Sequence, residues 1–215
     1  MRIENSLEII PLIDSPEFIE ECIELLNEEW PRSLNIRRIS LQKTLNNKPP
    51  LSLILINKEE NKLIGYSRLC PLPPQNDENN NNGCWIESVV VWRNLRGKGF
   101  GKILMNGIEE CAKEFGFRKI FLSTIDKSNF YIRCGYSHCS PIFNFGSNSK
   151  LFEGSGLINL FNNKNINENK TIKNNSNNLT KPSPLSPPPP PLLLPTIFPK
   201  NNSQKDQKFY LTKII

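Results

Sequence analysis

The chain has 215 residues, of which 37% are hydrophobic and 22% charged, a composition that supports one compact domain with a sizeable core. Its net charge of +6 comes entirely from residues 147–215, because residues 1–146 hold equal numbers of basic and acidic side chains. A neutral folded part and a tail without interleaved aromatic residues argue against nucleic acid as a partner.

Membrane and metal-binding proteins are also disfavoured. No stretch approaches 18 consecutive apolar residues, and the first residues lack the basic and apolar blocks of a secretory signal, so we expect a cytoplasmic protein with no membrane partner. The six cysteines form no Cys-x-x-Cys pair, and His138, the single histidine, has no metal-ligand spacing to them, so we expect no metal site. Nothing in the sequence indicates more than a monomer.

The N-terminal region is predicted to form a strand and then a helix. Residues 6–12 have the composition of a strand, and Asp14 and Pro16 are typical of a helix start, with Asp as the cap and Pro in the first turn. Apolar residues then recur at three- and four-residue steps until Pro31, which stops the helix.

Further elements follow from turn signals and from the period of the apolar residues. In chain order they are a weaker helix over 34–45, strands over 51–56, 63–69 and 85–92, a helix that runs from a glycine-rich turn to Phe115, a strand over 119–125 and a short helix over 128–134.

The composition changes beyond Phe145, where Asn, Ser, Lys and Pro dominate and no core can be buried. We interpret residues 147–206 as a low-complexity insertion that includes a proline-rich run over 182–195. Residues 208–215 are again typical of a strand. We therefore expect one domain over residues 1–215, with the insertion before its last strand.

The glycine-rich turn is the most informative segment. Its glycines allow several backbone N–H groups to converge on a pyrophosphate, and the helix that follows adds partial positive charge. The spacing fits neither a P-loop nor the dinucleotide-binding fingerprint. It resembles the Arg/Gln-x-x-Gly-x-Gly/Ala signature of the GCN5-related acetyltransferases, which implies acetyl-CoA binding by Arg96, Gly97, Lys98, Gly99, Phe100, Gly101 and Lys102.

A second segment, Asn129-Phe-Tyr131-Ile-Arg-Cys-Gly135-Tyr136, resembles another motif of that superfamily. The resemblance implies an α/β fold with a mixed, mostly antiparallel sheet that splays between its fourth and fifth strands and is flanked by helices. It makes Tyr131 the general acid that protonates the leaving thiolate, with an ordinary packed aromatic as the alternative. It also implies acetyl-CoA contacts for Asn129 and for Val89, Val90 and Val91 of the fourth strand.

Glu87 is the candidate general base, because it lies in the same strand region. An α-amino group has a pKa of about 7.7–8.0, so a weak base, acting directly or through water, can present it in neutral form. A surface or salt-bridged glutamate is the alternative.

Several segments resemble a narrower group, the acetyltransferases that modify the N-terminus of actin. The most specific is Trp30-Pro-Arg-Ser33, which the wider superfamily lacks. Actin N-termini are short runs of Asp or Glu, so this resemblance implies a substrate site with local positive charge. The candidate residues are Trp30, Arg32, Arg37, Arg38 and Arg68. The alternatives are solvated surface arginines and, for Trp30, a core residue at the end of a helix.

The same group carries a proline-rich insertion that binds profilin. Here Pro187–Pro191 is expected to adopt a polyproline II conformation, which fits aromatic grooves, although a plain spacer is the alternative. Two other functions stay open for the whole chain. One is an acetyltransferase for another protein N-terminus, a lysine or a small amine, and the other is an inactive fold that serves as a proline-rich adaptor.

Overall fold

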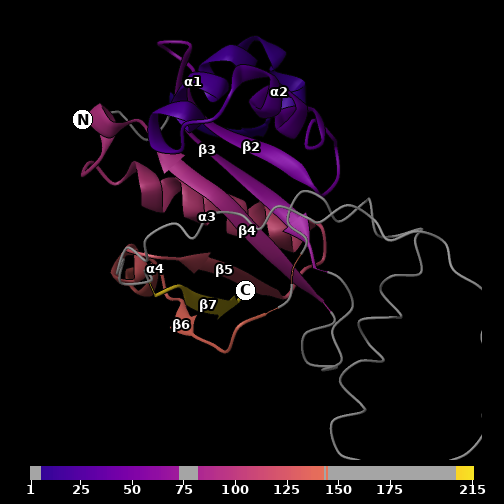
Figure 1. Cartoon of the computed structure of the whole chain (residues 1–215), viewed down its shortest axis with the longest axis vertical. Helices are drawn as coiled ribbons and strands as arrows, with labels where there is room; N and C mark the ends of the chain where they lie inside the picture. The colour runs from indigo at the N-terminus through magenta and orange to yellow at the C-terminus, as the bar shows by residue number, and fades with distance from the viewer. Residues whose placement is uncertain (1–5, 73–81, 143, 145–206) are drawn as a thin grey trace, which may run out of the picture.

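A seven-stranded sheet forms the centre of the protein (Figure 1). The computed structural model describes residues 6–72, 82–142, 144 and 207–215. The strands are β1 (Leu7–Pro11), β2 (Leu51–Asn57), β3 (Lys62–Pro71), β4 (Gly83–Val91), β5 (Lys119–Thr124), β6 (Ser137–His138) and β7 (Phe209–Ile214). Their order across the sheet is β1-β2-β3-β4-β5-β7-β6. Every neighbouring pair is antiparallel except β4 and β5, which confirms the predicted mixed sheet.

Helices cover both faces of this sheet. Among the described residues they are α1 (Ile19–Glu29), α2 (Leu34–Gln42), α3 (Phe100–Glu114) and α4 (Ser128–Arg133). Because side chains alternate along a strand, β2 serves two cores: Ile54 packs with residues of α1, whereas Leu53 and Leu55 pack with residues of α3. In Figure 1, α1 and α2 lie together beside β2 and β3. No helix in the described ranges has the length and apolar character needed to cross a membrane.

The parallel pair β4–β5 separates soon after it begins. It holds register only from Gly83 opposite Lys119 to Trp85 opposite Phe121, although β4 continues to Val91. Within the described ranges, the stretch Val89–Val91 therefore has no strand partner on its β5 side. Its backbone groups on that edge are available to another extended molecule, and the predicted splay between the fourth and fifth strands is present.

The start of α1 differs from the prediction. Asp14 makes no capping hydrogen bond, and two 3-10 turns, Leu12–Asp14 and Pro16–Phe18, precede a helix that begins at Ile19. Leu12 and Phe18 are both buried, so apolar packing of this segment outweighs the local capping preference of an aspartate. The second helix ends at Gln42 instead of residue 45 and has Ser33 as its cap, with Ser33 Oγ accepting from the Ile36 N–H at 3.4 Å.

The last strand, β7, closes the sheet between β5 and β6 as expected from residues 208–215. Lys213 on this strand reaches across to two other elements. Its Nζ donates to Oε2 of Glu109 on α3 at 2.6 Å and to the carbonyl of Cys134 at the end of α4 at 2.8 Å. The proposed insertion over 147–206, with its proline-rich run over 182–195, lies outside the described residues.

Candidate active site

The glycine-rich turn joins β4 to α3 through a short 3-10 turn, Arg93–Leu95. Gly97 and Gly99 adopt φ values of +78° and +90°, which L side chains rarely take, and Gly99 is the residue that caps α3. Among the described residues, the N–H groups of residues 97–101 donate to no backbone acceptor. These free donors, at the positive end of a helix, form a site suited to an anion such as a pyrophosphate.

Gly101 has a different role from the two glycines before it. A Cβ at this position would lie 3.2 Å from the ring of Phe130, so the absence of a side chain lets α3 approach α4 closely. Lys98, on the turn, and Lys102, in the first turn of α3, are both exposed. Asn129, predicted from the second motif, is exposed on the first turn of α4.

Arg96 holds the turn in place. Its Nε donates to the Val91 carbonyl at 2.9 Å, and its Nη2 donates to Oε2 of Glu29 at 2.8 Å. Glu29 is the last residue of α1, so this arginine ties the end of β4 to a helix on the other side of the molecule. Its role as a hydrogen-bond donor to the phosphates of acetyl-CoA stays a prediction, because two of its donor groups already have protein acceptors.

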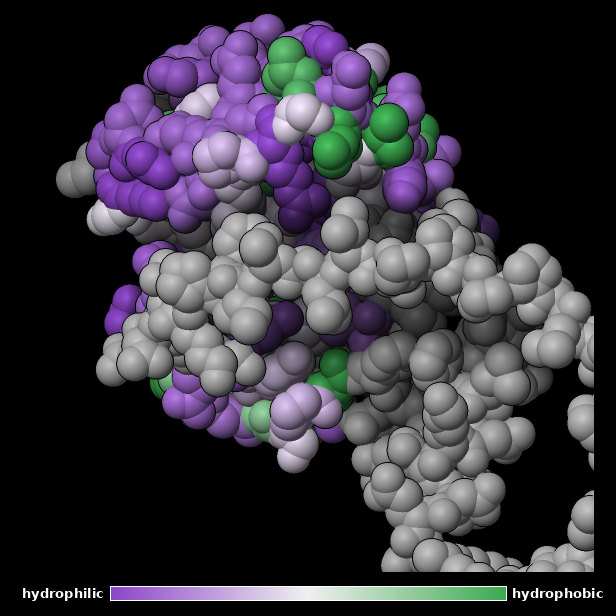
Figure 2. Space-filling model, in the orientation of Figure 1, coloured by the Kyte–Doolittle hydropathy of each residue, from purple (hydrophilic) through white to green (hydrophobic). Residues whose placement is uncertain are grey.

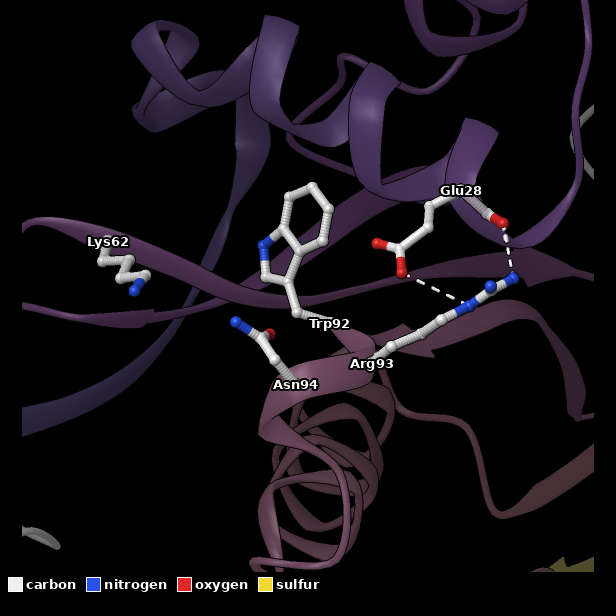
Figure 3. Close-up of a pocket in the computed structure, with 5 residues that line it drawn as sticks. All are labelled: Glu28, Lys62, Trp92, Arg93 and Asn94. Atoms are coloured by element: carbon white, nitrogen blue, oxygen red, sulfur yellow. Dashed lines mark hydrogen bonds and ion pairs between the residues drawn. The ribbon is translucent and has the colours of Figure 1, made fainter.

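Arg93 strengthens the same junction. It pairs with Glu28, with Nε 3.3 Å from Oε1 and Nη2 donating to the Glu28 carbonyl at 2.8 Å. Figure 3 shows this pair at one side of a shallow hollow of about 380 Å³, which Lys62, Trp92 and Asn94 also line. None of the residues that line the hollow belongs to either motif, so we assign it no part in the chemistry.

Tyr131 is almost fully buried, with 8% of its surface exposed. Its ring contacts Phe130 and Tyr136 edge to face, with centroids 5.0 and 6.0 Å apart. Burial, and after it the nearby Cys134 and Asp126, raises the pKa of its hydroxyl above the ordinary value. The phenol therefore keeps its proton at neutral and mildly alkaline pH, as a general acid must.

A second groove, of about 410 Å³, opens between α2 and the middle of the sheet, and strands β3 and β4 form its floor. The residues that line it are Trp30, Arg32, Ile36, Arg37, Ile39, Ser40, Lys43, Arg68, Glu87 and Ser88. It thus brings together the candidate base and four of the five predicted substrate residues. Arg38 is not among them: it lies outside the groove, where it pairs with Glu20 at 3.0 Å.

A β-bulge shapes the floor of the groove. Ser88 takes a φ of +58°, and the register of β3 and β4 shifts so that Ser88 and Val89 together lie opposite Ser67. The extra residue cannot join the regular ladder, so the strand bends at this point and exposes backbone polar groups. Glu87 lies immediately before the bulge. Val89 is part of the bulge, and Val90 and Val91 follow it.

Glu87 and Arg68 lie side by side on the groove floor. They are register partners on β4 and β3, and Arg68 Nη1 is 3.6 Å from Glu87 Oε1. Arg68 is only 5% exposed, its Nε donates to the Tyr66 hydroxyl at 2.6 Å, and its buried Nη2 has no hydrogen-bond partner. Glu87 is the more accessible of the two, with 26% of its side chain exposed.

Arg37 is more of a structural residue than the sequence indicates. Its Nη2 donates to the carbonyls of Leu26 and Trp30, and its Nε donates to Asn27 Oδ1 at 3.1 Å, so it closes the C-terminal end of α1. Burial, and after it the charges of Arg32 and Arg68, lowers the pKa of Arg37. Three arginines therefore repel one another around this groove, an arrangement that favours an anionic ligand.

The apolar side of the groove was not predicted from the sequence. Ile36 and Ile39 are more than half exposed, and Trp30, beside them, is 41% exposed. Figure 2 shows hydrophobic side chains gathered at the surface around α2. Ile36, Ile39 and Lys43 follow one another at helical spacing, which could have placed them on one face of α2 before the structure was known.

The comparison with family sequences decides the class of protein. Residues 19–136 match the Acetyltransferase (GNAT) family, a span that includes β4, the glycine-rich turn and Tyr131. The chain belongs to the GNAT acetyltransferase family. Among the described residues of this GNAT protein, no group of three or more His, Cys, Asp or Glu side chains could hold a metal ion.

Individual relatives agree with this assignment. The chain is 36% identical to mouse (Mus musculus) N-alpha-acetyltransferase 80 over 132 residues, which are 59% of this chain and 40% of the mouse protein. It therefore spans less than half the length of that relative. A crystal structure of an aminoglycoside 6'-N-acetyltransferase complexed with coenzyme A has a TM-score of 0.52 over 63% of this chain and 87% of that chain, with 17% identity. At that identity the likeness shows the fold alone.

Proposed function

We propose that the protein is an acetyl-CoA-dependent N-alpha-acetyltransferase that acetylates acidic protein N-termini, with actin as its acceptor. Membership of the GNAT family supports the acetyl transfer. The likeness to mouse N-alpha-acetyltransferase 80 supports an α-amine as the acceptor group. The observation that carries the acidic preference is the groove that Arg32, Arg37 and Arg68 line beside Glu87.

Acetyl-CoA would bind on the α3 side of the splayed strands. The free N–H groups of residues 97–101 would accept its pyrophosphate, with Lys98 and Lys102 beside them. The unpaired edge at Val89–Val91 would hold the extended pantetheine arm and offer a backbone N–H to the thioester oxygen.

The reaction proposed here is a direct transfer. The neutral amine nitrogen attacks the thioester carbonyl carbon, the new C–N bond forms and the C–S bond breaks. Tyr131 gives its proton to the departing thiolate sulfur, and the amine proton passes to Glu87, directly or through water. Tyr131 carries this proton at neutral pH, because burial raises the pKa of its hydroxyl above its ordinary value.

The charge of the groove separates the proposed acceptor from others. A polyamine or another polycation would be repelled by three clustered arginines, whereas a run of Asp or Glu would relieve their mutual repulsion. Trp30, Ile36 and Ile39 add an apolar wall, which suits a peptide segment better than a small hydrophilic amine. The retained turn and Tyr131 also disfavour an inactive adaptor, which needs neither.

This function is tested by acetyl transfer to synthetic peptides. The panel would contain a peptide that begins with three aspartates, the same peptide with three serines, one with a blocked α-amine and an internal lysine, and spermine. We expect acetylation of the acidic peptide with a kcat/KM at least about tenfold above the serine peptide. A preference for the lysine peptide or for spermine would contradict the proposal.

We further propose that Pro187–Pro191, which lies outside the described residues, binds profilin. A bound profilin would deliver actin at a raised effective concentration. The test compares the intact protein with a variant that lacks Pro187–Pro191, on free actin and on profilin-bound actin. Loss of rate only on the profilin complex is expected, and equal rates on it for both proteins would remove profilin from the proposal.

A further inference from the structure

We propose that the Arg68–Glu87 pair recognises the first residue of the acceptor as a unit, so that the first acidic side chain contributes far more to specificity than those after it. This inference rests on the proposed function and names which part of the substrate the groove selects. It comes from the unequal burial and unequal hydrogen bonding of the arginines in the groove.

Arg68 has a buried donor group without a hydrogen-bond partner. Its Nε donates to the Tyr66 hydroxyl at 2.6 Å, and its Nη1 is 3.6 Å from Glu87 Oε1, while Nη2 is buried without a partner. A buried guanidinium nitrogen without an acceptor is costly, because it has lost its water and gained nothing in exchange. Since Arg68 lines the groove, a carboxylate placed there would supply the missing acceptor.

A chain of hydroxyl groups fixes the direction of Arg68. Arginine can only donate and a carbonyl can only accept, so the chain has one orientation: Arg68 donates to Tyr66, Tyr66 to Ser52 at 2.7 Å, Ser52 to Thr44 at 2.6 Å, and Thr44 to the Leu41 carbonyl at 2.9 Å. The chain ends on α2, whose outer face forms the wall of the same groove. Because this chain already holds Arg68 in one position, ligand binding costs little conformational entropy at this side chain.

The charge pattern of the pair matches one residue of the acceptor. An N-terminal Asp or Glu carries an amine and a carboxylate on the same residue, only a few bonds apart. The groove floor carries the opposite charges in the same way, with Glu87 3.6 Å from Arg68. The next residue of the acceptor has no amine, and its Cα lies about 3.8 Å further along, so it cannot satisfy both partners.

Arg32 provides the contrast. It is exposed, so its guanidinium is hydrated and screened by salt. Arg37 is buried, but its Nε and Nη2 already donate hydrogen bonds to residues of α1. The second and third acidic side chains of an acceptor therefore meet a cation that is screened by solvent or one that is already hydrogen-bonded to the protein, and either contributes little selectivity.

The experiment is a position scan on the intact wild-type protein. Four peptides would be compared: three N-terminal aspartates, and the same peptide with Asn at position 1, 2 or 3. We expect Asn at position 1 to lower kcat/KM roughly 30-fold at both about 50 mM and about 300 mM salt. Asn at position 2 or 3 should lower it at most about threefold at low salt and hardly at all at high salt.

Equal losses at the three positions, or a loss at position 1 that fades with salt like the others, would overturn this inference alone. No acetylation of any of the four peptides would overturn the proposed function together with it. The scan needs no variant protein, so a folding defect cannot obscure it.

Tyr66→Phe tests the positioning of Arg68. The substitution keeps the ring and removes only the hydroxyl that accepts from Nε, so the discrimination at position 1 should fall from roughly 30-fold to roughly fivefold while positions 2 and 3 are unaffected. A uniform loss on all four peptides with the discrimination retained would show that Tyr66 serves packing only. Ser52→Ala, one link further along the chain, is the second variant and should give a smaller shift in the same direction.

Discussion

The four predicted arginines differ in how many donors they have free, and this difference follows from burial. Arg37 is occupied by the end of α1, Arg68 has one unused donor in a buried position, Arg32 faces solvent, and Arg38 pairs with Glu20 away from the groove. Only the first two have their geometry set by the protein. At the residue scale, charge alone therefore does not define a binding residue; burial together with an unpaired donor does, as at Arg68.

Substitution of Arg32 should weaken acceptor binding in a salt-dependent way. We expect Arg32→Gln to raise KM for an acidic peptide roughly threefold at low salt, because an exposed charge attracts the acceptor through solvent, and to have little effect at high salt. Arg38→Gln is the matched control, since it removes an equal charge from outside the groove. Equal effects of the two substitutions in steady-state kinetics would contradict the assignment of Arg32 to the groove.

Tyr131→Phe should lower kcat by about 100-fold with little change in KM for acetyl-CoA, because it removes one proton donor and keeps the packed ring. The pKa of Tyr131 is raised, so the hydroxyl is protonated at any pH below the ordinary tyrosine value of about 10. Consequently Tyr131 should impose no alkaline loss of kcat below about pH 10. The measurements are a pH–rate profile of the wild type and the kcat of the variant. A kcat for the variant within twofold of the wild type would contradict the role of Tyr131 as proton donor.

At the scale of elements, a partly buried ion pair joins β7 to α3 and α4. Lys213 links Glu109 of α3 to the end of α4, the helix that carries Tyr131. The strand that follows residues 145–206 therefore supports the position of α4 as well as completing the sheet.

Removal of this link should destabilise the whole domain. Lys213→Met leaves Glu109 buried without its cation, and we expect a loss of about 3 kcal/mol in the free energy of unfolding, measured by urea denaturation. Adding Glu109→Gln removes the unpaired charge and should restore at least about 1 kcal/mol. If the double variant is as unstable as the single one, the unpaired charge is not the cause.

Most elements could be predicted from the sequence because their apolar period is strong. The strands that became β2, β3 and β5 and the helices that became α1 and α3 were all predicted within a few residues. Three features depend on tertiary contacts and could not: the failed Asp14 cap, the two-residue strand β6, and the bulge at Ser88. Each results from packing between segments far apart in the chain.

At the scale of the whole molecule, the two proposed binding regions lie on either side of β4, where this strand splays from β5. The glycine-rich turn and Tyr131 come from α3 and α4, and the arginine groove lies on the other side of β4. The first region could be identified from the sequence, because its motifs are local. For the second region the sequence could only indicate candidates, because the fold decides which acceptors Arg37 and Arg38 bind.

The proposed function of this GNAT protein is acetyl transfer to the α-amine of an acidic N-terminus. To test it, unacetylated actin would be incubated with the protein and acetyl-CoA, and the new acetyl group would be located by mass spectrometry of the N-terminal peptide. We expect one acetyl group on the α-amine of the first residue and none on lysines. Acetylation of lysines, or an unmodified N-terminus under conditions where the protein acetylates another amine, would contradict it.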